Sequence, residues 1–295
     1  MKKFKLTDKF VTNIFGKKLF RIKALVSFGN VNAGELGGFV EKEKNLSNTG
    51  DAWVSGNAMV YGDARVSGNA MVYGNAMVYG DAWVSGNAMV YGDAMVYGDA
   101  WVSGNAMVYG DAMVSGNAMV YDDAMVYGDA RVSGNALVSG DARVSGDARV
   151  SGNAMVYGDA RVYGDALVYG NAMVYGDARV SGDAEVYGNA MVSGDARVYG
   201  NALVSDDAMV SGDALVSGNA DYSAVKGFGR YFRTTTFFRC TDKVVRVQCG
   251  CFYGDLPQFR SIVKKTHGEG KLAKEYLAIA DLMEFHFSDE EDADK

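Results

Sequence analysis

Residues 50–61 read Gly-Asp-Ala-Trp-Val-Ser-Gly-Asn-Ala-Met-Val-Tyr, which is two copies of one six-residue unit. The unit Gly-(Asn/Asp)-Ala-x-Val-(Ser/Tyr) is repeated 28 times without a gap through residue 217. Alanine and valine occur in every copy, whereas glycine is replaced twice, by Asp122 and Asp206. A fixed short period indicates a solenoid, in which each unit buries its apolar side by stacking on its neighbours.

The unit is too short for a helical repeat and suits a short β-strand followed by a corner. At period two, Ala and Val point inward and the x residue points outward. The segment Ser/Tyr-Gly-Asn/Asp forms the corner, because Gly, Asn and Asp tolerate left-handed backbone angles. The sequence therefore predicts a mainly β protein with a valine-lined interior.

The repeat resembles the bacterial hexapeptide-repeat proteins, whose fold is a left-handed parallel β-helix of triangular section. The resemblance implies three hexads per coil, hence about nine coils and a prism on the order of 45 Å long. It also implies trimers with parallel axes. Hexapeptide acyltransferases use a histidine base, but the 28 hexads hold no His, Cys or Lys and no inserted loop.

Counting in eighteens assigns the x residues to three faces. The first face begins at Trp53 and the second at Met59, and both take charged residues in their later coils. The first face contains a stripe of arginines that is a candidate anion-binding site, although a solvated face with local Asp141/Arg143 and Asp159/Arg161 pairs is the plainer interpretation. The stripe is Arg143, Arg161, Arg179 and Arg197.

The third face begins at Arg65 and is then uncharged at x for eight coils, beside a corner that carries Asn from Asn117 to Asn189. A contiguous apolar column on a rigid prism marks an interface. We expect self-association through this face, with a foreign ligand as the alternative. The expected interface residues are Trp83, Trp101, Met119, Leu137, Met155, Met173, Met191 and Met209.

Charge and cysteine content restrict the class of protein. Residues 1–49 carry a net charge of +6, and the hexads, with seven Arg against nineteen Asp and one Glu, carry −13. An acidic prism argues against nonspecific wrapping of nucleic acid. Three cysteines, an odd number, indicate a reducing compartment. With no signal peptide or membrane span evident, we expect a cytoplasmic protein, or a virion component assembled there.

Residues 1–49 are predicted to be an N-terminal β cap, with strands at 3–6, 10–14 and 19–28, because a β-helix must cover its exposed strand edges. The segment around 20–41 resembles the leaders of uncharacterised hexapeptide proteins from phages and prophages. This resemblance implies a phage or prophage origin.

Residues 218–288 are predicted to form a small α+β domain, followed by an acidic tail at 289–295. A hairpin with the two-residue loop Asp242-Lys243 would place Phe238, Cys240, Val245, Val247, Cys249 and Cys251 on one face and Thr236 opposite Cys249. A helix capped by Asp255 should run through Lys265 and stop at Gly268, and a second should span 271–287. The run from Thr235 to Gly268 also resembles a domain attached to phage β-helical proteins.

The C-terminal domain holds the remaining candidate sites. His267 and His286 lie near helix ends, where structural roles are expected. Cys240, Cys249, Cys251 and His267 have poor zinc spacing and are better explained as small core residues. Four further arginines are candidate contacts to an anionic ligand or host protein: Arg230, Arg233, Arg239 and Arg246.

These observations predict a noncatalytic structural or binding protein without metal or cofactor. It would be a rigid oligomeric scaffold, most simply a trimer, that presents the C-terminal domain. The alternatives are a hexapeptide-type acyltransferase and a phage-encoded inhibitor of a host protein, nucleic acid or nucleotide signal.

Overall fold

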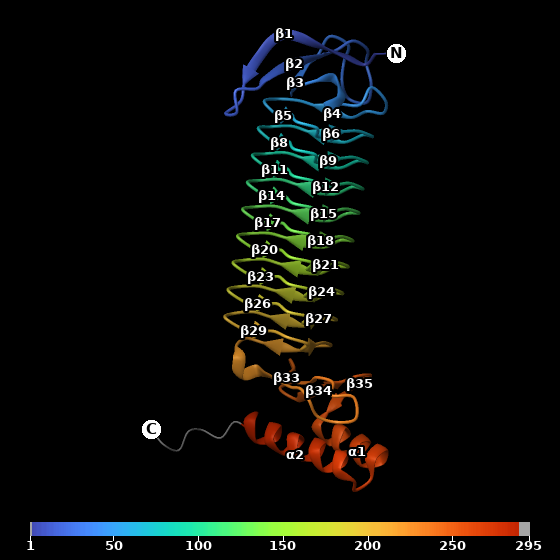
Figure 1. Ribbon diagram of the computed structural model, residues 1–295, viewed down its shortest axis with the longest axis vertical. Coiled ribbons are helices and arrows are strands. Elements are labelled where there is room, and N and C mark those ends of the chain that lie inside the picture. Colours follow the sequence, from blue (N-terminus) through green and yellow to red (C-terminus); the bar gives the residue numbers. More distant parts are fainter. Residues whose placement is uncertain (1, 289–295) are drawn as a thin grey trace, which may run out of the picture.

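The computed structural model describes residues 2–288 and shows a long solenoid rod with added structure at both ends (Figure 1). Strands β1 (Phe4–Thr12), β2 (Lys18–Ala24) and β3 (Leu36–Val40) cover one end, and two helices lie beyond the other. The predicted mainly β solenoid is therefore confirmed. The acidic tail expected at 289–295 lies outside the described residues.

The rod consists of 28 two-residue strands, from β4 (Trp53–Val54) to β31 (Leu215–Val216), each made of the x residue and the following Val. Successive strands join three different parallel sheets in turn, so each strand pairs with the one eighteen residues later. Met155, for example, lies beside Met173. The 28 hexads thus make just over nine turns with three hexads per turn, in agreement with the expected nine coils. Its left-handed sense stays an expectation from the resemblance.

Ala and Val line the interior, as predicted: the repeat alanines are fully buried, and so are the valines apart from a trace of exposure at Val66. Each coil therefore adds alanine and β-branched valine side chains to one continuous core, and this burial stabilises the rod together with the backbone hydrogen bonds between coils. The x residues point outward, and all but Trp53 are at least partly exposed. Trp53 is in register with Met71 but is only 2% exposed, because the N-terminal segment covers it and Phe28 packs edge-on against its ring at 5.4 Å.

The corners require glycine for two independent reasons. Gly110 has a φ of 73°, and an added Cβ would lie 3.0 Å from the backbone N of Gly128 in the next coil. Asp122 and Asp206 replace glycine and keep the left-handed conformation, each with a φ of 59°. Aspartate tolerates this region better than most residues but still strains the backbone there.

The N-terminal segments satisfy backbone carbonyls that the first coil would otherwise leave unpaired. Phe39 and Glu41 donate their N–H groups to the carbonyls of Ala58 and Val60 at 2.9 and 3.0 Å. The ammonium group of Lys3 donates to the carbonyl of Ala52 at 2.7 Å and to that of Gly50. Burial is the main cause that lowers the pKa of Lys3 to about 8, with Asp51 opposing it.

Next to Lys3, a short 3-10 turn, η1 (Glu43–Asn45), completes this cap. The amide of the buried Asn45 donates to the carbonyls of Ala64 and Gly62 at 2.8 and 3.1 Å. Leu46 forms a parallel bridge to Val66 in the first coil. Solenoid-like pairing therefore extends upstream of residue 50. The strands expected at 3–6 and 10–14 are one irregular strand, β1, and the third expected strand ends at Ala24.

The C-terminal segment forms a four-stranded antiparallel sheet and two helices. The strands are β32 (Tyr222–Val225), β33 (Thr235–Arg239), β34 (Val245–Cys249) and β35 (Phe252–Asp255). Helix α1 (Leu256–His267) begins at the predicted N-cap Asp255 and ends at Gly268, and α2 (Lys271–His286) follows. Both predicted helices are confirmed. None of the helices in the described residues is long and apolar enough to cross a membrane.

The predicted register of the C-terminal hairpin is wrong by one residue. Its loop has three residues, 241–243, because Lys243 adopts a φ of 65° and Cys240 donates its N–H to the carbonyl of Val244 at 3.1 Å. Thr235 rather than Thr236 therefore lies opposite Cys249.

The one-residue shift changes which side chains share a face. Phe238 and Cys240 belong to the core of the solenoid, whereas Phe237 and Val247 pack against the helices. The sheet is thus buried on both faces and closes the end of the rod. A short turn, η2 (Asn219–Asp221), connects it to the last coil.

Candidate interaction face

The third face of the solenoid presents the column of x residues expected to form an interface. Its nine strands run from β6 (Arg65–Val66) to β30 (Met209–Val210). The ladder places each x residue directly beside the next, as with Trp101 and Met119. The structure therefore brings all eight predicted residues, Trp83, Trp101, Met119, Leu137, Met155, Met173, Met191 and Met209, into one line.

Two stacked tryptophans begin this apolar column. The rings of Trp83 and Trp101 lie 5.4 Å apart and 10° from parallel, and their residues are 42% and 43% exposed. Each indole N–H donates to a serine one coil earlier, Trp83 to Ser67 at 3.1 Å and Trp101 to Ser85 at 3.2 Å. These hydrogen bonds fix the rings in place while leaving their apolar surface accessible. The methionines and Leu137 are partly exposed.

The corner between the second and third faces carries a ladder of side-chain amides. Asn117 donates to Asn135 at 2.9 Å, and the pattern continues to Asn189, which donates to Asp207 at 3.0 Å. Each amide after Asn117 thus uses one donor and one acceptor along the rod. The ladder leaves the edge of the third face uncharged from Asn117 to Asn189. The intermediate members are Asn135, Asn153 and Asn171.

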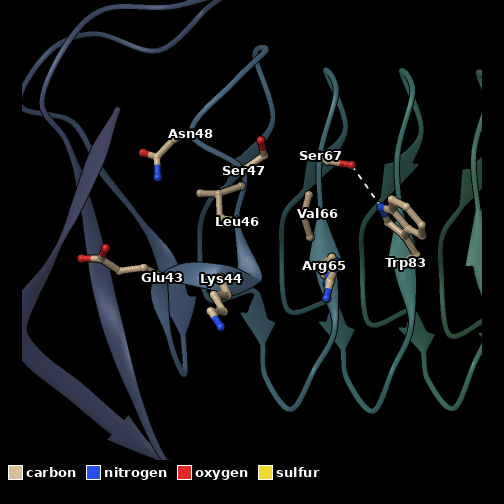
Figure 2. Close-up of a pocket in the computed structure, with 9 residues that line it drawn as sticks. All are labelled: Glu43, Lys44, Leu46, Ser47, Asn48, Arg65, Val66, Ser67 and Trp83. Atoms are coloured by element: carbon tan, nitrogen blue, oxygen red, sulfur yellow. Dashed lines mark hydrogen bonds between the residues drawn. The ribbon is translucent and has the colours of Figure 1, made fainter. Parts of the chain in front are cut away.

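At the N-terminal end of the column, beside Trp83, a hollow of about 620 Å³ lies where the N-terminal cap meets the first two coils (Figure 2). Trp83 stands at one side with its N–H directed to Ser67, and Glu43 and Lys44 stand on the cap at the other side. Its lining has mixed charge, and Glu43 pairs with Lys2. The remaining lining residues are Leu46, Ser47, Asn48, Arg65 and Val66.

The first face carries the predicted arginine stripe on adjacent strands, and Arg143, Arg161 and Arg179 border a small hollow of about 250 Å³. The local ion pairs expected for this stripe are not formed. Within residues 2–288, no carboxylate pairs with Arg143, Arg161, Arg179 or Arg197. Asp141 lies in the turn at the corner and Arg143 in the strand that follows, and both side chains are exposed to solvent.

The four candidate arginines of the C-terminal segment do not gather at one place. Arg246 pairs with Asp242 at 2.6 Å across the hairpin loop. Arg239 contacts Asp221 at 3.7 Å and donates to the carbonyl of Phe287 at 3.0 Å, so it joins sheet, turn and helix. Arg230 and Arg233 instead line a separate cavity.

Cys249, Cys251 and His267 border one cavity, whereas Cys240 and His286 lie apart from it. Within residues 2–288, no three His, Cys, Asp or Glu side chains are placed to hold a metal ion. His267 stacks on Tyr276 with ring centroids 5.8 Å apart, and His286 lies edge-on to Phe287. Cys240 is buried in the core at the end of the solenoid, where desolvation and then Asp213 raise the pKa of its thiol to about 12. This thiol is therefore protonated at neutral pH.

Sequence reasoning missed the residues that close the two ends of the rod. Lys3, Asn45, Asp221 and Thr236 pair with solenoid backbone, yet nothing in their sequence context marks them. The amide ladder, in contrast, was visible at period eighteen.

Comparison with known families agrees with this architecture. The family model described as YdcK Beta solenoid repeat matches fourteen segments that together cover more than half of the chain. A comparison with curated proteins finds no match. The matched segments are residues 52–68, 64–80, 72–86, 82–98, 88–104, 100–116, 112–128, 130–146, 142–158, 148–164, 160–176, 166–182, 184–198 and 196–212.

Proposed function

The chain belongs to the YdcK β-solenoid repeat family, and on this premise we propose that it is a noncatalytic structural protein whose rods associate side by side through the third face. The observation that carries the proposal is the uncharged column from Trp83 to Met209. The first and second faces carry arginine in their later coils, at Arg143 and Arg131 for example. Desolvating such unpaired charges is unfavourable, so burying the third face along its full length has the smallest desolvation penalty of the three faces.

The repeat spacing favours a second copy of this chain as the partner. The column repeats once per coil, at about 4.8 Å. A partner that contacts every coil in the same way must repeat at the same distance, and a second solenoid of this type does so. Equivalent side chains such as Met155 and Met173 would then meet equivalent sites along the whole rod.

We propose a closed assembly of parallel rods, with three copies as the resemblance to hexapeptide-repeat proteins implies. Closed symmetric assemblies bury every copy of the interface, so no unpaired apolar surface remains to which further copies could add. The segments at both ends of the rod would serve as caps that prevent end-to-end stacking, because unpaired strand edges promote such association.

The noncatalytic part of the proposal rests on the residues of the rod. Its hexads hold no His, Cys or Lys, and both histidines lie in the C-terminal segment. We expect no thiol release from acetyl-CoA across a panel of amino-sugar acceptors. Turnover that disappears in His267→Ala would instead favour the acyltransferase alternative.

The assembly is tested by light scattering coupled to size-exclusion chromatography. Met155→Lys combined with Met173→Lys should give folded monomer, because four or six ammonium groups would meet within a closed interface. Met77→Lys combined with Met95→Lys, on the second face, is the matched control and should leave the oligomer intact. A wild-type chain that is monomeric at high micromolar concentration would refute the assembly.

A further inference from the structure

A cavity of about 340 Å³ is lined entirely by residues of the C-terminal segment. It is bounded by helices α1 and α2, by the turn between β34 and β35, and by the loop at 226–234. Its volume is within the range of small-molecule sites. The lining residues are Arg230, Tyr231, Arg233, Cys249, Gly250, Cys251, Phe252, Phe259, Ile262, Val263, Thr266, His267 and Tyr276.

The inner part of the cavity is apolar and largely aromatic. Phe259 and Val263 are almost fully buried beneath it. The ring of Phe259 meets Tyr276 edge-on at 5.9 Å and Phe252 at 5.6 Å. Rings set at such angles offer both faces and edges, with which an aromatic ligand forms favourable stacked or edge-to-face contacts.

The charged groups at the cavity are all basic. Arg230 and Arg233 lie over the ring of Tyr231, at 5.5 and 5.2 Å from its centroid. Within residues 2–288 neither forms an ion pair, and no carboxylate lines the cavity. Glu275, close by in sequence to Tyr276, instead faces the N–H of Gly229 and the ammonium group of Lys271.

This arrangement is unusual in a chain whose net charge is −7. Two unpaired guanidinium groups at an apolar cavity favour an anion, because arginine binds carboxylate and phosphate oxygens in pairs. Tyr276 adds a polar group to the lining. Burial followed by Cys249 raises the pKa of Tyr276, so its hydroxyl stays a neutral donor at physiological pH.

We infer that this cavity binds a small organic anion, an aromatic ring carrying one phosphate or carboxylate group. The ring packs against Phe252, Phe259 and Tyr276, and the anionic group lies between Arg230 and Arg233. The inference does not require self-association, because every lining residue belongs to the C-terminal segment. Three of them, Tyr231, Arg233 and Gly250, also border a hollow with Met191 and Met209 of the third face.

The test is isothermal titration calorimetry of the full chain with phenyl phosphate and with benzoate. Phenol and inorganic phosphate serve as the two halves of the ligand. At least one of the two aromatic anions should bind at least tenfold more tightly than either half. Binding of inorganic phosphate as tight as that of both aromatic anions would overturn the inference, since it would leave no role for the apolar wall.

Two variants separate the site from general electrostatics. Arg230→Gln combined with Arg233→Gln should weaken binding at least tenfold, whereas Arg161→Gln combined with Arg179→Gln, on the first face, should leave it unchanged. Ile262→Glu, at a residue that is 39% exposed and therefore replaceable, should exclude the anion by repulsion while circular dichroism stays unchanged. Equal weakening by both arginine pairs, or undiminished binding to folded Ile262→Glu, would refute the site.

Discussion

The backbone N–H of Met209 donates to the side-chain hydroxyl of Thr236 at 2.9 Å. Met209 lies in the last coil of the third face, and in every earlier coil the equivalent N–H donates to the alanine carbonyl of the next coil, as Met191 does to Ala208. The hydroxyl of Thr236, in strand β33, thus replaces the alanine carbonyl that a further coil would have supplied. Asp221 acts in the same way, accepting from the N–H of Ser217 at 2.8 Å.

Thr236→Val should destabilise the protein, because it keeps the shape of a buried side chain but removes the acceptor for Met209. An unsatisfied buried N–H costs about 1 to 3 kcal/mol in the free energy of unfolding. Urea denaturation followed by circular dichroism measures the change. Thr12→Val, at an exposed position of β1, is the control, and an equal effect of both changes would contradict the capping role.

Val156→Asp should abolish soluble folded protein. The side chain of Val156 is fully buried in the narrow interior, where an unpaired carboxylate costs several kcal/mol. Met95→Gln, on the outside of the second face, should be tolerated. The comparison requires only soluble yield and thermal melting, and normal melting of Val156→Asp would disprove the assignment of inside and outside.

Asp122→Gly should stabilise the solenoid. Asp122 has a φ of 59°, and glycine at this position would relieve strain on the order of 1 kcal/mol. The opposite change, Gly110→Ala, should destabilise, since its added Cβ would approach the backbone of Gly128 to 3.0 Å. Chemical denaturation of both variants gives the sign of each change in the free energy of unfolding. A destabilised Asp122→Gly would show that the interactions of the aspartate outweigh the backbone strain.

Stability should fall as the pH rises from about 10 to 12. Stacked tyrosine rings, such as Tyr61 and Tyr79 at 4.9 Å, lie in ladders along the corners. Burial and then Tyr79 raise the pKa of Tyr61 to about 12, above the value near 10 of an unfolded chain. The folded state therefore holds the phenol proton longer, so this contribution is complete below pH 10 and is lost as the pH passes through 12.

Thermal melting across this range measures the loss, and absorbance of tyrosinate reports the ionisation. Tyr61→Phe provides the comparison, because it removes one ionisable ring while keeping the stack. The variant should lose less stability than wild type between pH 9 and pH 12. An identical loss in both proteins would place the alkaline sensitivity elsewhere.

Much of the architecture could be predicted because the repeat is local and translational. Ala154 and Val156 point inward and Met155 outward in a strand, and the eighteen-residue recurrence then places Met155 beside Met173 without further information. The helix that begins after Asp255 could also be predicted, because its N-capping signal is local in the sequence. Asp255 accepts a hydrogen bond from the N–H of Gln258, three residues later, at 2.8 Å.

The hairpin at 241–243 could not be predicted in the same way. Both a two-residue and a three-residue loop suit Thr241-Asp242-Lys243, and the choice decides whether Phe237 or Phe238 faces the solenoid. The solenoid end selects the three-residue loop, because Thr236 must reach Met209 while Phe238 fills the core. The expected pairing of Asp141 with Arg143 was wrong for a related reason, since spacing along the chain does not give the distance between two charged groups.

The sequence by itself determined the inside, the outside and the three faces of the rod, because a hexad that recurs without interruption leaves each residue only one position in a stacked coil. Only the tertiary structure decided how the ends are closed and where the cavity of Arg230 and Arg233 lies. Those features depend on single contacts between distant segments, Lys3 with Ala52 or Thr236 with Met209, and no period in the chain encodes them.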